Sequence, residues 1–167
     1  MTIRIRAERD GDAPAIFALT KAAFHEAPHA DGDEAELVDR LRDSGDLALS
    51  LVAVNQDKAI IGHVAFSPVS ISGAPGQWYQ LAPISVMPMR QKSGIGSRLV
   101  EAGLAQLAER GAAGVALVGD PAYYSRFGFT QDHGLSLDPE MDPFLQVTLL
   151  EASAMLTGKL RLAPAFG

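Results

Sequence analysis

The chain has 167 residues, of which 47% are hydrophobic and 20% charged, no cysteine, and a formal net charge of −6 at neutral pH. This length and composition predict a single globular domain, residues 1–167, with its own apolar core, and exclude a disordered chain. The net charge argues against a nucleic acid partner, and the lack of cysteine excludes disulfides, thiolate metal ligands and a cysteine acyl-enzyme intermediate.

The N-terminal segment places charged residues at alternate positions and has no apolar run of the kind found in signal peptides. We therefore expect a cytoplasmic protein. Residues 59–89 contain no charged side chain, but four prolines and several glycines interrupt this stretch, which excludes a membrane helix. It is typical of buried strands instead.

The first part of the chain predicts one strand and two helices. Apolar and charged residues alternate over Thr2–Glu8, the pattern of a strand with one wet face. Asp12 is a candidate N-cap for a helix that ends near Phe24. A second helix spans Glu34–Asp43 and stops at Gly45, a residue suited to a left-handed C-terminal cap.

The middle of the chain predicts a meander followed by a β-α-β unit. A hairpin joins Leu47–Val54 to Ala59–Val69, and Gln77–Val86 adds a third strand. An amphipathic helix over Ser93–Arg110 then connects this strand to Val115–Val118. Because a helix separates them, we expect the two flanking strands to be parallel.

The last part predicts a short helix and two further strands. Asp120 is suited to cap that helix with Pro121 in its first turn, and Gly128 ends it. Strands follow at Phe144–Leu150 and, as an edge piece, at Leu160–Leu162. Together these elements predict a mixed sheet flanked by helices.

The segment Gln91-Lys92-Ser93-Gly94-Ile95-Gly96 stands between a strand and a helix. The first N–H groups of a helix have no partner within the helix and favour anions, and the two glycines let a phosphate approach the main chain. Leu99 stands where a dinucleotide fingerprint needs its third glycine, and the Gly-Lys-Ser/Thr of a Walker A loop is missing. We therefore expect a different diphosphate-bearing ligand.

This segment resembles the acyl-CoA-binding motif of the GNAT N-acetyltransferases, Gln/Arg-x-x-Gly-x-Gly/Ala. One helix and one strand later, Gly119-Asp-Pro-Ala-Tyr-Tyr-Ser-Arg-Phe-Gly-Phe129 resembles the second signature of that family, Tyr-x-x-x-Gly-Phe. The residues of this second segment are similar to those of a bacterial branch of the family. The resemblance covers the C-terminal two-thirds of the chain by motif and the remainder by pattern. It implies a GNAT-like acyl-CoA N-acyltransferase fold of the α/β class (α+β mixed), with a central, mostly antiparallel sheet.

The resemblance also implies an activity and a site. The expected reaction is direct transfer of acetyl from acetyl-CoA to the primary amine of a small molecule or peptide, with no metal. Tyr124 is the expected general acid, placed near the thioester sulfur. The expected cofactor-binding residues lie on the preceding strand and in the glycine segment: Ile84, Ser85, Val86, Gln91, Lys92, Ser93, Gly94, Ile95, Gly96 and Ser97. Pro83 supports locally broken strand pairing there; the alternative is an edge strand with an ordinary bulge.

Two positions depart from the common pattern of the family. Leu117 stands where an asparagine is frequent and Asp120 where an alanine is frequent, which puts the usual side-chain contact to pantetheine in doubt. The general base is open among Glu34, Glu36 and His63, each of which also suits a structural role.

The sequence leaves a metal site, two rival functions and a dimer interface open. His25 and His29 precede several carboxylates, which suggests a metal site, but Pro28 argues against a regular helix there and favours an acidic loop beside the acceptor. A catalytically silent acyl-CoA-binding regulatory module is the main functional rival, and acetylation of a protein lysine or N-terminus is a narrower one. The apolar tail from Leu160 to Phe166 is a candidate homodimer interface.

Overall fold

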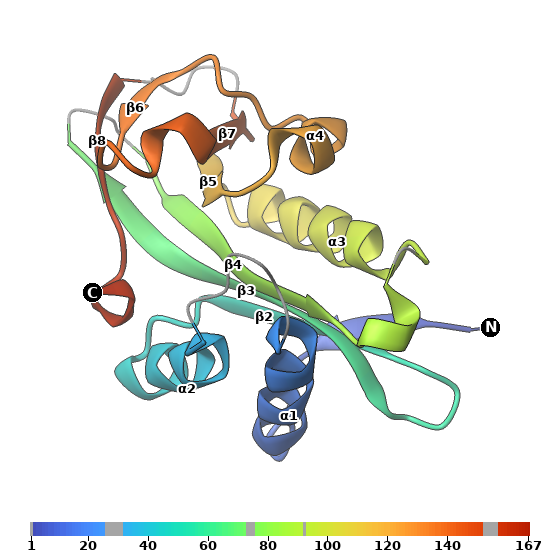
Figure 1. Cartoon of the computed structure of the whole chain (residues 1–167). Helices are drawn as coiled ribbons and strands as arrows, with labels where there is room; N and C mark the ends of the chain where they lie inside the picture. The colour runs from blue at the N-terminus through green and yellow to red at the C-terminus, as the bar shows by residue number, and fades with distance from the viewer. Residues whose placement is uncertain (1, 26–31, 73–75, 92, 152–156) are drawn as a thin grey trace.

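The computed structural model describes residues 2–25, 32–72, 76–91, 93–151 and 157–167. Within these ranges the chain forms four α-helices and eight strands, arranged as Figure 1 shows. The helices are α1 (Ala13–Phe24), α2 (Glu34–Ser44), α3 (Ile95–Glu109) and α4 (Pro121–Tyr124). The strands are β1 (Arg4–Ala7), β2 (Leu49–Val54), β3 (Ile60–Ile71), β4 (Trp78–Val86), β5 (Gly114–Val118), β6 (Gly134–Ser136), β7 (Leu145–Leu149) and β8 (Thr157–Arg161). None of the described helices is long and apolar enough to span a bilayer.

The strands form one mixed sheet in the order β1-β2-β3-β4-β5-β7, and β8 joins it by pairing with both β3 and β6. Most of the pairs are antiparallel. The parallel ones are β4 with β5, as the helix between them predicts, and β6 with β8. The expected mixed, mostly antiparallel sheet is thereby confirmed.

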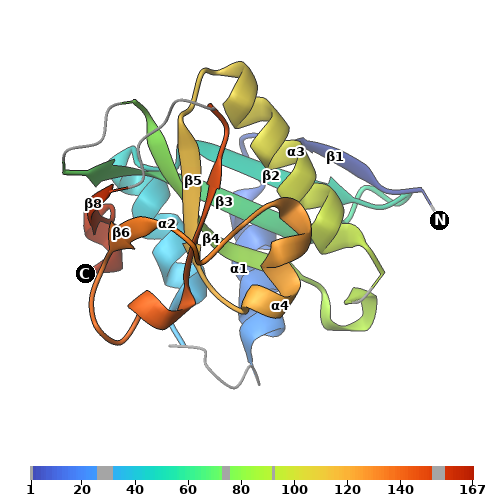
Figure 2. The ribbon, with the colours of Figure 1, turned by 90° about the horizontal axis from the view of Figure 1, so that it is seen from above.

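Helices cover both faces of this sheet. Figure 1 shows α3 on one face and α1 with α2 on the other, and Figure 2 shows α3 crossing over the central strands. The apolar side of α3 buries Leu99, Val100 and Leu107 in the largest core cluster, together with Phe66 of β3. Opposite, Ile16 of α1 and Val38 of α2 pack on β2. These buried stripes account for the helical periodicity seen in the sequence.

Several sequence predictions need correction. The Asp12 side chain makes no cap at α1; it pairs instead with Arg6 at 2.7 Å, because a charge-assisted bond to guanidinium outcompetes a bond to a helix N–H. β6 was not predicted, since three residues are too few to show an alternation. Leu160–Leu162 is no last edge strand: the strand begins at Thr157 and lies between β3 and β6.

The C-terminal tail packs inside the chain. Leu160 and Ala163 are buried, and Ala165 and Phe166 pack against the cluster that Leu37 and Leu41 of α2 form with Ala163. These apolar residues therefore already have partners. The homodimer stays a prediction, but the packed tail does not support it as the interface.

Gly103 of α3 faces the Phe66 ring so closely that a Cβ added there would lie 2.4 Å from two ring carbons. We expect Gly103→Ala to lower the free energy of unfolding by about 1–3 kcal/mol, because overpacking the core outweighs the gain of up to about 1 kcal/mol in helix propensity. Urea unfolding of this variant measures the effect, with Glu101→Ala on the exposed side of α3 as the control. A Gly103→Ala midpoint at or above that of the wild type would contradict this account of the packing.

Candidate functional site

β4 and β5 diverge from each other along their length. They are hydrogen-bonded only from Trp78 to Gln80 on β4 and from Gly114 to Ala116 on β5. Beyond this point β4 stays paired with β3 through Val86, while β5 stays paired with β7 through Val118. The edge of β4 that faces β5 therefore presents unpaired main-chain groups, and such groups need a partner from elsewhere.

An irregularity in β4 coincides with this divergence. Val64 of β3 pairs with Ile84, but Phe66 pairs with Leu81, so one residue of β3 lies opposite Ala82 and Pro83. Proline has no N–H to give to a ladder, which accounts for the bulge here. β4 is bonded on both sides before the bulge and on one side after it. The broken pairing expected near Pro83 is present together with a bulge, so β4 is an inner strand before the bulge and has a free edge after it.

A tight turn leads into α3. Gly94 is the N-cap with a φ of +87°, a conformation that side chains rarely adopt, and the first helical bond runs from Arg98 N to Gly94 O. The N–H groups of Ile95, Gly96 and Ser97 therefore have no partner within the helix. A Cβ added at Gly94 would meet nothing within 4 Å, so the turn is open to an approaching group.

The polar side chains of the segment brace the turn. Gln91 Nε2 donates to Val86 O at 3.1 Å, and Ser93 Oγ donates to Arg90 O. The Gln91 bond ties this segment to the end of β4, and the Ser93 bond closes the turn on itself. The Gln91 and Ser93 side chains are thus engaged with neighbouring main-chain carbonyl groups. Lys92, also predicted here, lies outside the described residues.

The second signature folds as α4 and a following 3₁₀ turn, Ser125–Phe127. Asp120 Oδ1 accepts a hydrogen bond from Ala122 N at 2.9 Å, so the predicted cap is present, and Gly128 ends the turn with a φ of +89°. This small helix stands above α3 (Figure 1). The two signature segments, which are separated in the sequence by a helix and a strand, therefore lie close together in the structure.

Tyr123 and Tyr124 have different surroundings. A Cβ built on Gly96 would lie 2.9 Å from the Tyr123 hydroxyl oxygen, so this phenol lies beside the first turn of α3. The guanidinium of Arg126 stacks over the Tyr123 ring, 4.7 Å from its centroid. The Tyr124 ring instead packs on Gly119, where a Cβ would lie 2.7 Å from a ring carbon, and on Phe129. Only Tyr124 is thus held against the end of β5.

Burial raises the pKa of Tyr124 to about 12, with smaller contributions from Tyr123 and Asp120. The phenol therefore keeps its proton throughout the neutral range. No hydrogen bond joins its hydroxyl to another described residue.

A cavity of about 1450 Å³ opens where β5 passes into α4. Its lining includes Gln80 at the point where β4 and β5 separate, residues 118–121, and the segment around Phe144. No described residue of α3 lines it, whereas Phe166 and Gly167 after β8 do. Gln80 was missed at the sequence level, although a polar residue between apolar neighbours in a buried strand is a usable signal.

The three candidate bases lie outside this cavity. His63 is fully buried on β3, where its Nε2 lies 2.8 Å from Ser50 Oγ. Glu36 pairs with Lys21 at 3.4 Å and so joins α2 to α1, while Glu34 accepts a bond from Gly32 N. These contacts favour the structural interpretation of all three.

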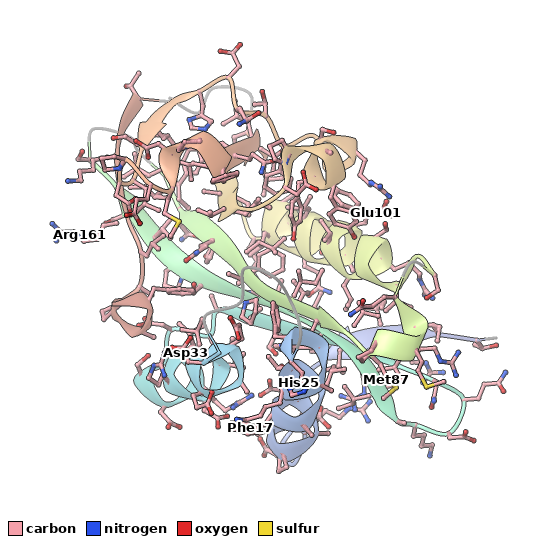
Figure 3. All side chains as sticks on the ribbon, viewed as in Figure 1. Phe17, His25, Asp33, Met87, Glu101 and Arg161 are labelled. Carbon is pink, nitrogen blue, oxygen red and sulfur yellow. The ribbon has the colours of Figure 1, made fainter. Side chains whose placement is uncertain are left out.

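Among the residues that the structure describes, no three His, Cys, Asp or Glu side chains are grouped to hold a metal ion. His25, at the end of α1, is exposed (Figure 3). Of the other members of the predicted acidic loop, His29 and Asp31 fall outside the described ranges, whereas Asp33 pairs with Arg40 at 3.1 Å and Glu34 begins α2.

Comparison with known proteins decides the family. Residues 4–131 match the model of the acetyltransferase (GNAT) domain. This chain belongs to the GNAT acetyltransferase family. The curated relatives of this GNAT chain include the uncharacterized N-acetyltransferase YhbS of Escherichia coli K12, 45% identical over 125 residues, which are 75% of this chain and 72% of YhbS. By family, the protein is an acyltransferase.

Solved structures agree over nearly the whole chain. A GNAT family acetyltransferase from Brucella melitensis, in complex with acetyl-CoA, has a TM-score of 0.86 at 42% identity and covers 99% of each chain. YhbS from Escherichia coli, in complex with CoA, has a TM-score of 0.89 at 38% identity, covering 98% of this chain and 91% of its own. The expected GNAT fold is confirmed.

Proposed function

We propose that this protein transfers the acetyl group of acetyl-CoA directly to a primary amine, as one domain of 167 residues acting in the cytoplasm. The observation that carries the proposal is the divergence of β4 and β5 next to the open turn that begins α3. An unpaired strand edge suits the amide groups of a pantetheine arm, and a helix N-terminus suits a pyrophosphate. The acetyl-CoA and CoA complexes of the similar structures support this choice of donor.

In this proposal, main-chain groups of residues 84–86 bind the pantetheine arm, and those of residues 91–97 bind the pyrophosphate. The thioester then lies between the ends of β4 and β5, within reach of Tyr124. The chain has no cysteine, which favours direct attack by the amine over an acylated cysteine.

Tyr124 acts in this proposal as the general acid. When the amine attacks the thioester carbonyl, the C–N bond forms and the C–S bond breaks, and the sulfur leaves as a thiolate. The phenol donates its proton to that sulfur and regains one, through solvent, from the nitrogen that has become an amide. The Tyr124 pKa of about 12 makes the proton available at every neutral pH.

Calorimetry with acetyl-CoA and with CoA tests the donor, and release of free thiol with a panel of primary amines tests the transfer. We expect heat, thermal protection and amine-dependent thiol release. Binding without thiol release for small amines or for peptides with lysine and free N-termini would instead identify a silent acyl-CoA-binding module. A folded sample that shows neither heat nor protection would overturn the proposal.

Gly96 offers a direct test of the pyrophosphate seat. We expect Gly96→Val to raise the Kd for acetyl-CoA by about 10-fold or more, because its side chain obstructs hydrogen bonds from the helix N–H groups to a charged phosphate. The same side chain would also contact the Tyr123 hydroxyl. The double variant Gly96→Val/Tyr123→Phe removes that second contact, and calorimetry should still find weak binding. Wild-type affinity in the double variant would mean that the phosphate does not lie here.

A further inference from the structure

The cavity at the end of β5 contains a buried polar atom that the protein leaves without a partner. Gln80 is 5% exposed, and its Oε1 has no hydrogen bond to any described residue. Gln80 is also the last residue of β4 that pairs with β5, opposite Ala116. Gln80 therefore lies where the two strands separate and belongs to the lining of the cavity, with its side-chain oxygen buried behind that lining. A buried amide oxygen calls for a donor, and an N–H group of a ligand is one.

The charges around the cavity suit a cation. Three carboxylates line it, those of Asp120, Asp138 and Glu140. Two cations, Lys159 and Arg161, belong to the lining as well, and like the three carboxylates they are exposed, so the carboxylates outnumber the cations by one. Figure 3 shows Arg161 extending outward from the edge of the molecule. A primary amine is an ammonium at neutral pH, with N–H groups for Gln80 and a charge that the carboxylates favour.

The walls of the cavity are largely apolar. Its volume of about 1450 Å³ exceeds the range of about 300–1,000 Å³ usual for small-ligand pockets. Two of its residues, Met141 at 40% and Phe144 at 50% exposure, are among the most exposed large apolar side chains of the described residues. The other apolar lining residues include Ile71, Val118, Leu137 and Leu160. Such a surface gains free energy when an apolar group covers it.

The cavity reaches the end of β5 against which Tyr124 packs, although Tyr124 itself is not part of its lining. Gly119 belongs to its lining, and the Tyr124 ring packs against the α-carbon of Gly119. The carbonyl of Phe144 accepts hydrogen bonds from Gly119 N at 3.1 Å and from Gln146 Nε2 at 3.2 Å. These bonds fix the apolar wall to the strand end that carries Tyr124. A molecule bound here would present its amine beside the thioester.

We infer that the acceptor is a primary amine with a bulky apolar or aromatic body, whose N–H group binds Gln80 Oε1 and whose body packs on Met141 and Phe144. This assignment rests on the proposed acetyl transfer for its role, but the binding site can be tested by itself. It makes Gln80 a positioning residue for the amine, and Phe144 a residue that sets specificity.

Calorimetry on the CoA-saturated protein, with 4-phenylbutylamine, n-butylamine and 1,4-diaminobutane as probes, tests the inference. We expect 4-phenylbutylamine to bind at least about 10-fold more tightly than n-butylamine, because burying most of a phenyl ring stabilises the complex by at least that factor in affinity. Phe144→Ser should weaken the binding of 4-phenylbutylamine much more than that of n-butylamine and so remove most of this preference. Equal affinities for the two amines, or a preference for the diamine, would overturn the inference.

Gln80→Leu tests the polar contact, and Ser67→Ala is its matched control. Ser67 pairs with Gln80 across β3 and β4 and also has a buried oxygen without a partner, but it does not line the cavity. Gln80→Leu should weaken the binding of both monoamines by about 5-fold or more. The melting temperature of this variant should stay level or rise, because an unpaired buried oxygen is lost. Ser67→Ala should change neither affinity. Unchanged amine affinity in a folded Gln80→Leu protein would overturn the role of Gln80.

These binding results separate the inference from the proposed function. Tight, Phe144-dependent binding of 4-phenylbutylamine without thiol release from acetyl-CoA would leave the amine site standing and refute the transfer. Equal acetylation of n-butylamine and 4-phenylbutylamine would establish the transfer and refute the apolar acceptor.

Discussion

Tyr124→Phe is expected to lower kcat by about 100-fold or more, the lower end of what a positioned general acid contributes. The change removes one oxygen atom and keeps the ring that packs on Gly119 and Phe129. The Kd for acetyl-CoA should stay within about 3-fold of the wild-type value, because the donor is proposed to bind through main-chain groups. Steady-state thiol release with the best amine of the panel, together with calorimetry, measures both quantities.

Tyr123→Phe is the matched control, since it removes the same atom from the neighbouring residue of the same helix. Its hydroxyl lies beside Gly96, at the start of α3, and not against the end of β5. We expect its kcat to stay within about 3-fold of the wild-type value. Full turnover by Tyr124→Phe, or equal losses in the two variants, would remove the catalytic assignment.

The pH profile gives a second check on Tyr124. Because its pKa is raised to about 12, the phenol stays protonated up to strongly alkaline pH. The rate should therefore rise with pH as the acceptor ammonium loses its proton. It should not fall again below about pH 10, and a fall in that range that disappears in Tyr124→Phe would contradict the raised pKa.

Local chemistry made much of this site predictable from the sequence. Gly94 adopts a left-handed conformation at a helix start, Asp120 caps a helix that begins with proline, and Gly128 ends it. Each of these features depends on a few neighbouring residues whose backbone preferences are strong. The parallel pairing of β4 with β5 was also predictable, because only one helix separates the two strands.

Features that depend on distant residues were not predictable in this way. The sequence predicts that Asp12 caps a helix, but its carboxylate forms a salt bridge with Arg6 of the preceding strand. The cavity is assembled from β4, the end of β5, the segment before β7, and β8, and no short pattern joins these parts. Gln80 is ambiguous in sequence for the same reason, since its environment comes from Ala116, Ser67 and the cavity.

The hydrogen bonds around His63 fix its tautomer. Ser50 Oγ donates its single proton to Glu8 Oε1 at 2.8 Å, so His63 Nε2 carries the proton in its own 2.8 Å contact with Ser50. Glu8 is in turn held by Arg42 through two bonds of 2.9 Å. His63 Nδ1 is left as a buried lone pair without a partner among the described residues. Burial lowers the pKa of His63 to about 4, because charging the ring there costs its hydration.

This low pKa predicts a loss of stability in mild acid. The unfolded chain takes up a proton at His63 as the pH falls below about 6.5, while the folded protein does not until about pH 4. The free energy of unfolding should therefore fall by about 3 kcal/mol between these two pH values and stop falling on this account below pH 4. Burial acts to raise the pKa of Glu8, but hydrogen bonds from Arg42 and Ser50 and the charge of Arg42 together lower it below its ordinary value of about 4.5. Glu8 therefore adds its own loss of stability only below about pH 4.5.

Urea unfolding at several pH values between 7 and 4, on the wild type and on His63→Gln, measures this effect. Glutamine keeps an N–H donor for Ser50 but does not titrate, so its stability curve should be flatter by about 3 kcal/mol across this range, whatever its absolute stability. The comparison of slopes removes the contribution of every other titrating group that the two proteins share. Equal slopes would mean that His63 gains its proton in the folded protein as readily as in the unfolded chain, and the buried, neutral ring described above would be wrong.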